Sequence, residues 1–74
     1  MLLPENVHPE NSIYFNGAIV LNVLLNNNNI EMIDLYERVN QVQNMSFPIF
    51  ILCLDWLYLI DAAELINKKV VLCF

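Results

Sequence analysis

The segment from residue 47 to residue 62, FPIFILCLDWLYLIDA, decides the fold. Ser46 precedes it as a candidate N-cap, and Pro48 falls in the first turn, where its missing N–H leaves no hydrogen bond unmade. We therefore predict a helix from Phe47 to Ala62. At about 100° per residue, its apolar side chains surround nearly the whole helix. A helix of this kind is normally covered on all sides, so we expect it at the centre of the domain.

The two sides of this predicted helix differ in polarity. One side gathers the apolar residues Ile49, Cys53, Trp56, Leu57 and Ile60. Asp55 and Tyr58 lie on the opposite side, with Ile51 among them and Leu54 at one edge. A carboxylate with such neighbours needs a hydrogen-bond or charge partner when it is covered. That partner lies either in this chain or in another one.

Length and composition indicate one small domain with a surplus of apolar residues. The chain has 74 residues, of which 58% are hydrophobic, against ~45–50% in typical globular domains. A domain of this size has little interior in which to bury them. We therefore expect part of the apolar surface to contact another protein.

A second helix is predicted upstream, over residues 13–25, capped by Ser12 or by the asparagine before it. Phe15 and Ile19 lie beside the asparagines that mark its polar side, so they are apolar residues on a face that should be wet. Gly17 costs about 1 kcal/mol relative to alanine in the middle of a helix. We expect it to permit the close approach of another backbone.

Four consecutive asparagines, at residues 26–29, follow this helix. They are interpreted either as an amide-rich recognition loop or as a helix stop and turn, and the tolerance of asparagine for left-handed geometry favours the turn. Ile30 is expected to form a very short strand. Apolar residues then recur at intervals of three and four from Met32 to Val42, which predicts an amphipathic surface helix.

The end of the chain is predicted to be a β-hairpin. Residues 64–66 and 69–74 are rich in β-formers, and Asn67 and Lys68 make a two-residue turn between them. The predicted fold is mainly α with a C-terminal β-hairpin, which is the plan of a winged helix-turn-helix-like domain with the hairpin as its wing. This domain spans residues 12–74, and an N-terminal arm spans residues 1–11.

Charge argues against free-standing nucleic-acid binding. Eight acidic residues and three basic ones give a formal net charge of −5, whereas nucleic-acid binding draws on many lysines and arginines. Lys68 and Lys69 on the predicted wing tip are weak nucleic-acid candidates. We expect them to touch a phosphate only inside a larger complex that supplies more positive charge.

We find no motif for catalysis, a metal ion, a cofactor or a small-molecule substrate. His8 is the one histidine, and Cys53 and Cys73 lack the spacing of a metal or redox pair, so both are expected to be reduced packing residues. Asp55 and Asp61 point about 120° apart on the predicted helix and would not share a site. The N-terminus does not resemble a secretory signal, and the apolar run is too short and too acidic for a membrane span. We expect a non-enzymatic, cytoplasmic protein.

Three segments of the chain resemble a known family. They are MLLP at residues 1–4, SIYFNGA at residues 12–18 and FILCLDWLY at residues 50–58. Together they resemble the small middle component of bacterial ABC-three-component systems, and most closely the subgroup called middle component 6. The resemblance extends over nearly the whole chain. Members of this family tend to have glycine after the third helix, where this chain has Asp61.

The resemblance implies a winged-helix-like adaptor that acts beside an SMC/Rad50-like ABC ATPase and an effector, in defence against phage and other invading DNA. In the third helix the side chains that would face a DNA groove are apolar or acidic, which suits a protein groove. The predicted partner-binding residues are Phe15, Ile19, Ile51, Leu54, Asp55 and Tyr58. Two alternatives stay open: a winged-helix DNA-binding regulator that uses Lys68 and Lys69, and an acidic antitoxin-like protein.

Overall fold

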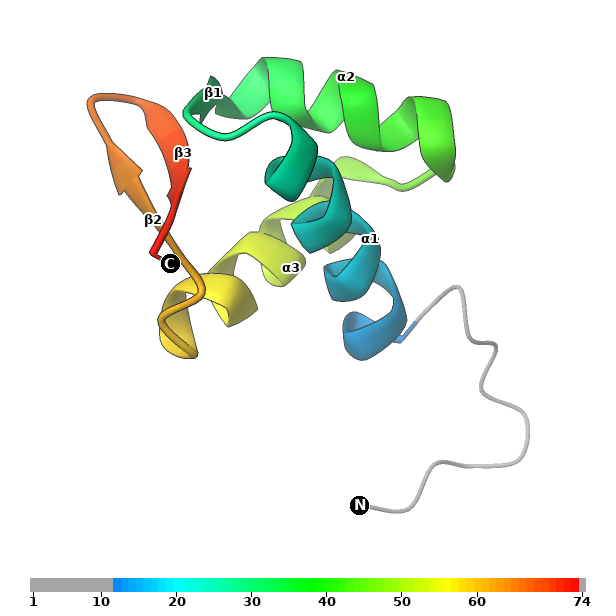
Figure 1. Ribbon diagram of the computed structural model, residues 1–74. Helices are drawn as coiled ribbons and strands as arrows, with labels where there is room; N and C mark the ends of the chain where they lie inside the picture. The colour runs from blue at the N-terminus through cyan, green and yellow to red at the C-terminus, as the bar shows by residue number, and fades with distance from the viewer. Residues whose placement is uncertain (1–11, 74) are drawn as a thin grey trace.

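The structure, a computed structural model, describes residues 12–73, and within that range it contains three helices and three strands (Figure 1). In chain order the elements are α1 (Ile13–Asn26), β1 (Ile30–Glu31), α2 (Met32–Val42), α3 (Phe47–Leu59), β2 (Ala63–Ile66) and β3 (Lys69–Leu72). The prediction of a mainly α chain with a C-terminal hairpin is confirmed. The predicted arm over residues 1–11 lies outside the described residues.

The ends of α1 are set by polar side chains. Ser12 is the N-cap, and its Oγ accepts hydrogen bonds from the N–H groups of Tyr14 and Phe15 at 3.2 and 3.4 Å. At the other end Asn27 is the C-cap, and its side-chain amide donates to the carbonyl of Val23 at 2.9 Å. Asn29 has a left-handed φ of 63°. The helix-stop interpretation of the asparagine run is therefore confirmed.

The three strands form an antiparallel sheet in the order β1-β3-β2, at one end of the helical layer (Figure 1). Val70 on the central strand is completely buried and pairs with Ile30 of β1 on one side and Leu65 of β2 on the other. Continuing the β1–β3 register brings Asn28 opposite Leu72, and there Asn28 Oδ1 accepts the Leu72 N–H at 2.9 Å. The Asn28 side chain therefore adds one more hydrogen bond to the pairing of β3 with β1, which has only two residues.

The hairpin turn is formed by Asn67 and Lys68, as predicted. Both have positive φ, 51° and 69°, which is the pair of left-handed residues that a type I′ turn requires. Because β2 begins at Ala63 and β3 ends at Leu72, the strands differ by one or two residues from the predicted bounds.

The third helix ends at Leu59, so the prediction that it reaches Ala62 is wrong. Asp61 has a left-handed φ of 60°. Its N–H donates to the Tyr58 carbonyl at 3.1 Å, and the Ala62 N–H donates to the Leu57 carbonyl at 2.9 Å. This is the Schellman pattern of helix termination, in which the left-handed residue is usually glycine. Because this chain has aspartate there, the stop signal was missing from the sequence.

The core is built from one side of each helix and closed by the sheet. Its buried hydrophobic residues are Val20, Val23, Leu24, Leu35, Val39, Met45, Phe50, Cys53, Leu54, Leu57, Ala62, Ala63 and Val70. On α3 the buried residues are Phe50, Cys53, Leu54 and Leu57. The apolar side predicted from the wheel is therefore rotated from the observed core side, and Ile60, which follows the helix, is 51% exposed.

Ring contacts fix the start of α3 beneath α2. The Tyr36 ring lies 5.2 Å from that of Phe47 and 5.0 Å from that of Phe50. The Tyr36 hydroxyl donates to the carbonyl of Met45 at 2.9 Å, just before α3 begins. Ser46 occupies the N-cap position, but its side chain makes no capping hydrogen bond. The start of α3 is therefore stabilised by the contacts of Tyr36, Phe47 and Phe50, because its N-cap side chain makes no hydrogen bond to the helix.

Gly17 allows α1 to approach α3 closely. A Cβ atom at this position would lie 2.7 Å from both Cε3 and Cζ3 of Trp56, which is closer than carbon atoms pack. The sequence had led us to expect another backbone at this position. The neighbour of Gly17 is instead the indole ring of Trp56 on α3. Tyr14, one turn earlier, packs edge-on against the same ring at 5.4 Å. Trp56 is thus held between two residues of α1.

We expect Gly17→Ala to lower the free energy of unfolding. In an ordinary helical position this change adds about 1 kcal/mol of stability through helix propensity, but overpacking a core costs roughly 1–3 kcal/mol. The net loss is measurable by urea denaturation followed by circular dichroism. In a Trp56→Leu background, where the ring is gone, the same substitution should become stabilising. Stabilisation by Gly17→Ala in both backgrounds would contradict the described contact.

Candidate functional site

The outer side of α3 exposes large apolar side chains. Leu52 is 50% exposed and Leu59 is 82% exposed. These two residues are seven apart, so they lie about 20° from each other around the helix axis. Asp55 is exposed between them. We call Leu52, Asp55 and Leu59 the outer stripe of α3.

The neighbours of the outer stripe differ on its two sides. On one side Trp56 is covered by α1 through Gly17 and Tyr14. On the other side Ile51 and Tyr58 are half-buried against the core. Beyond the first turn of α3, where Phe47 and Pro48 are also exposed, the outer stripe is therefore the part of the helix that the described chain leaves open to solvent.

The predicted partner-binding residues separate into two groups and one exception. Phe15 and Ile19 each lie two residues from Gly17, and so about 160° from it around α1. Since Gly17 faces α3, these two residues face away from it. Phe15 is 41% exposed, whereas Ile19 is half-buried and packs against the core. Ile51, Asp55 and Tyr58 lie on α3, on or beside the outer stripe.

The exception is Leu54, which is 1% exposed and belongs to the core of this chain. Its inclusion among the partner-binding residues was wrong, because the observed core side of α3 is rotated toward the edge on which Leu54 lies. Sequence reasoning also missed Leu52 and Leu59 as candidate partner-binding residues. The sequence did contain a sign of this surface: residues seven apart lie on the same side of a helix, and here a charged residue lies between them.

Tyr58 is half-buried and packs against the hydrophobic core. Its hydroxyl oxygen is buried and has no hydrogen-bond partner among the described residues. Burial raises the pKa of Tyr58, and the nearby carboxylate of Asp55 raises it further. The hydroxyl therefore stays protonated and neutral at physiological pH.

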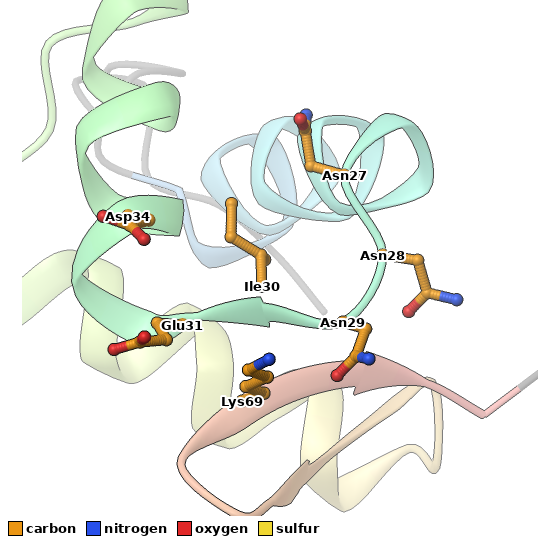
Figure 2. A pocket seen from close by; sticks show the side chains of 7 residues that line it. All are labelled: Asn27, Asn28, Asn29, Ile30, Glu31, Asp34 and Lys69. Atoms are coloured by element: carbon orange, nitrogen blue, oxygen red, sulfur yellow. The ribbon is translucent and has the colours of Figure 1, made fainter.

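A shallow hollow of about 300 Å³ lies between the asparagine run, the start of α2 and the hairpin (Figure 2). Lys69 enters it from β3, and Glu31 and Asp34 line it from the other side. Two carboxylates therefore stand close to one of the two predicted wing-tip lysines. The negative charge of these carboxylates weakens the positive potential around Lys69 that would attract a phosphate.

The described residues were searched for metal-binding groups and for membrane-spanning helices. Among residues 12–73 there is no group of three or more His, Cys, Asp or Glu side chains that could hold a metal ion. His8 lies outside the described residues. Within the same range no single helix is long and apolar enough to cross a membrane. Only α2 and α3 taken together have sufficient length and apolar composition, and these two helices are bent by 111° relative to each other.

Comparison with known families decides which group of proteins this structure represents. A family model described as ABC-three component (ABC-3C) system Middle Component 6 matches residues 3–73. The chain belongs to this family. No curated protein and no solved structure has significant similarity to it. The resemblance drawn from the three sequence segments is thereby confirmed, and Middle Component 6 is not a known class of enzyme.

The two cysteines of this Middle Component 6 chain have different environments. Cys53 is completely buried in α3, and burial raises the pKa of its thiol to about 11. Cys73 is exposed, so its prediction as a packing residue was wrong. Its Sγ donates to Glu64 Oε2 at 3.9 Å. Desolvation first, and the carboxylates of Glu64 and Asp61 second, raise the pKa of Cys73 as well.

We expect iodoacetamide at pH 8 to modify Cys73 and to spare Cys53 in the folded chain. The reagent needs both access and thiolate, and Cys53 lacks both. Intact mass spectrometry should find one adduct on the native chain and two in urea. A Cys73→Ser variant is the control and should take up no reagent while folded. Rapid double modification of the native chain would contradict the described burial of Cys53.

Proposed function

We propose that this Middle Component 6 chain is a non-catalytic, cytoplasmic adaptor in bacterial defence against phage and other invading DNA. It binds an SMC/Rad50-like ABC ATPase and couples that ATPase to an effector. Membership of a three-component ABC family supports a role inside a multi-protein assembly.

The observation that carries this proposal is the exposure of the outer stripe. Leu52 and Leu59 are 50% and 82% exposed, on the helix that also supplies four residues to the core. Burial of apolar surface contributes about 25 cal/mol per Å², so covering these side chains gives a partner a source of binding free energy. Contiguous exposed apolar surface is typical of sites that contact other proteins.

We also propose that the fold is a winged helix. The order of elements, the sheet order β1-β3-β2 and the two-residue turn of the hairpin support this assignment. In DNA-binding winged helices the third helix offers polar and basic side chains to the major groove. The third helix here, Phe47–Leu59, contains no lysine or arginine. Its exposed side favours a protein as the ligand.

The DNA-binding regulator remains the second candidate because Lys68 and Lys69 are both exposed at the hairpin turn. Against it stands the charge of the described residues. They contain the three basic residues of the chain and six of its acidic ones, Glu31, Asp34, Glu37, Asp55, Asp61 and Glu64. Phosphate binding by counterion release needs several cations on one surface.

The adaptor proposal is tested by co-expression of the tagged full chain with the other two components of its own system. We expect the ATPase to co-purify through affinity capture and to elute with the chain in gel filtration. The tag on an unrelated small acidic protein is the control for non-specific capture. A chain that elutes alone, with the ATPase unbound, would count against an adaptor role.

The regulator is tested on the isolated full chain by fluorescence anisotropy with duplex DNA at low ionic strength. We expect no measurable binding, because two lysines, one of them close to carboxylates, release few counterions. Binding that weakens with added salt, and that is lost in a Lys68→Ala/Lys69→Ala variant, would support the regulator instead.

A further inference from the structure

We propose that the outer stripe of α3 receives a single α-helix of the partner protein, and that this helix presents a lysine or arginine to Asp55 between two apolar contacts. The inference rests on the proposed adaptor function and deepens it. The proposed ligand of the outer stripe is a helix with a basic residue, and it is not a second copy of this chain.

The spacing of the outer stripe fits a helix. Leu52, Asp55 and Leu59 follow one another at intervals of three and four residues, and Pro48, four residues before Leu52, is exposed as well. This is the spacing of a coiled-coil seam, along which two helices pack side by side. Leu52 and Leu59 stand about 10 Å apart along the axis, since each residue rises 1.5 Å. A partner helix of about three turns covers both leucines and the aspartate between them.

The charge of Asp55 specifies what the partner helix carries opposite it. Asp55 has no hydrogen bond or ion pair with any described residue. A helix laid over the outer stripe would remove water from the carboxylate of Asp55, and a buried charge without a partner is strongly unfavourable. Because α1 and α3 contain no basic residue, and no described residue pairs with Asp55, we expect the partner to supply the cation. Arginine or lysine flanked by apolar residues meets both requirements.

The same charge argues against a second copy of this chain. In an antiparallel pair of α3 helices, Leu52 of one copy would lie opposite Leu59 of the other, and the two Asp55 side chains would come within one residue of each other. In a parallel pair they would lie directly opposite. Either arrangement brings two carboxylates together in an apolar contact, which is destabilising. With a net charge of −5, self-association is further disfavoured.

The test uses the full chain co-expressed with the other two components of its system. Asp55→Lys places like charges together and should weaken binding of the wild-type partner about thirtyfold or more. Asp55→Asn removes the attraction without repulsion and should have a smaller effect. Leu52→Asp and Leu59→Asp should each weaken binding at least about tenfold.

Two variants on α2 serve as matched controls. Asp34→Lys reverses an exposed acidic residue, and Ile33→Asp replaces an apolar residue that is 59% exposed. Both should bind within about twofold of the wild type. Circular dichroism of each variant checks that the fold is kept, since every substituted residue is exposed. A photo-crosslinking residue at position 52 or 59 then identifies the contacting segment, which should be a helix with a central lysine or arginine.

The outcomes separate the inference from the adaptor function. If the wild-type chain binds and the Asp55 and leucine variants bind equally well, the inference is wrong while the adaptor function survives. A crosslink to a second copy of this chain, or to a segment without a basic residue, also overturns it. If the wild-type chain binds neither component, both proposals fail. Recovery of Asp55→Lys binding by glutamate at the crosslinked basic residue would support the inference directly.

Discussion

A helix with apolar residues on every side needs cover on every side, and the described chain covers α3 only in part. The decisive contact is between Gly17 and Trp56: because glycine has no Cβ, the indole ring sits directly on α1. This brings the two helices together, and Phe50, Cys53, Leu54 and Leu57 of α3 are buried in the core. The sheet closes the core with Val70. After these contacts, the outer stripe remains exposed on α3, together with Phe47 and Pro48 at the start of the helix.

Much of this fold follows from the sequence, because periodicity and polar caps act locally. Ser12, the asparagine run and the two-residue turn at Asn67 and Lys68 each fix a boundary by their own side-chain chemistry. The end of α3 was not predictable in the same way. Asp61 adopts a left-handed conformation that the sequence signals clearly only when glycine is present. Glycine is the residue that usually takes this left-handed position at the end of a helix.

The candidate surface was less predictable, because it depends on which side of α3 the rest of the chain covers. A helical wheel ranks positions by polarity, and on an apolar helix that ranking is weak. It identified Asp55 but included the buried Leu54, and it overlooked the exposed Leu59. The wheel also gave no relation between helices, so it grouped Phe15 and Ile19 with residues of α3 that they do not face. Gly17, one of the strongest signals, predicted a close approach but not its partner ring.

The account depends on one claim, that another polypeptide covers the outer stripe of α3. The most direct measurement is a structure, by electron cryo-microscopy, of the chain assembled with the other components of its system. The account predicts that Leu52 and Leu59, now 50% and 82% exposed, become buried there against a helix of another component. An assembly in which both leucines stay exposed to solvent while the chain is held elsewhere would contradict it.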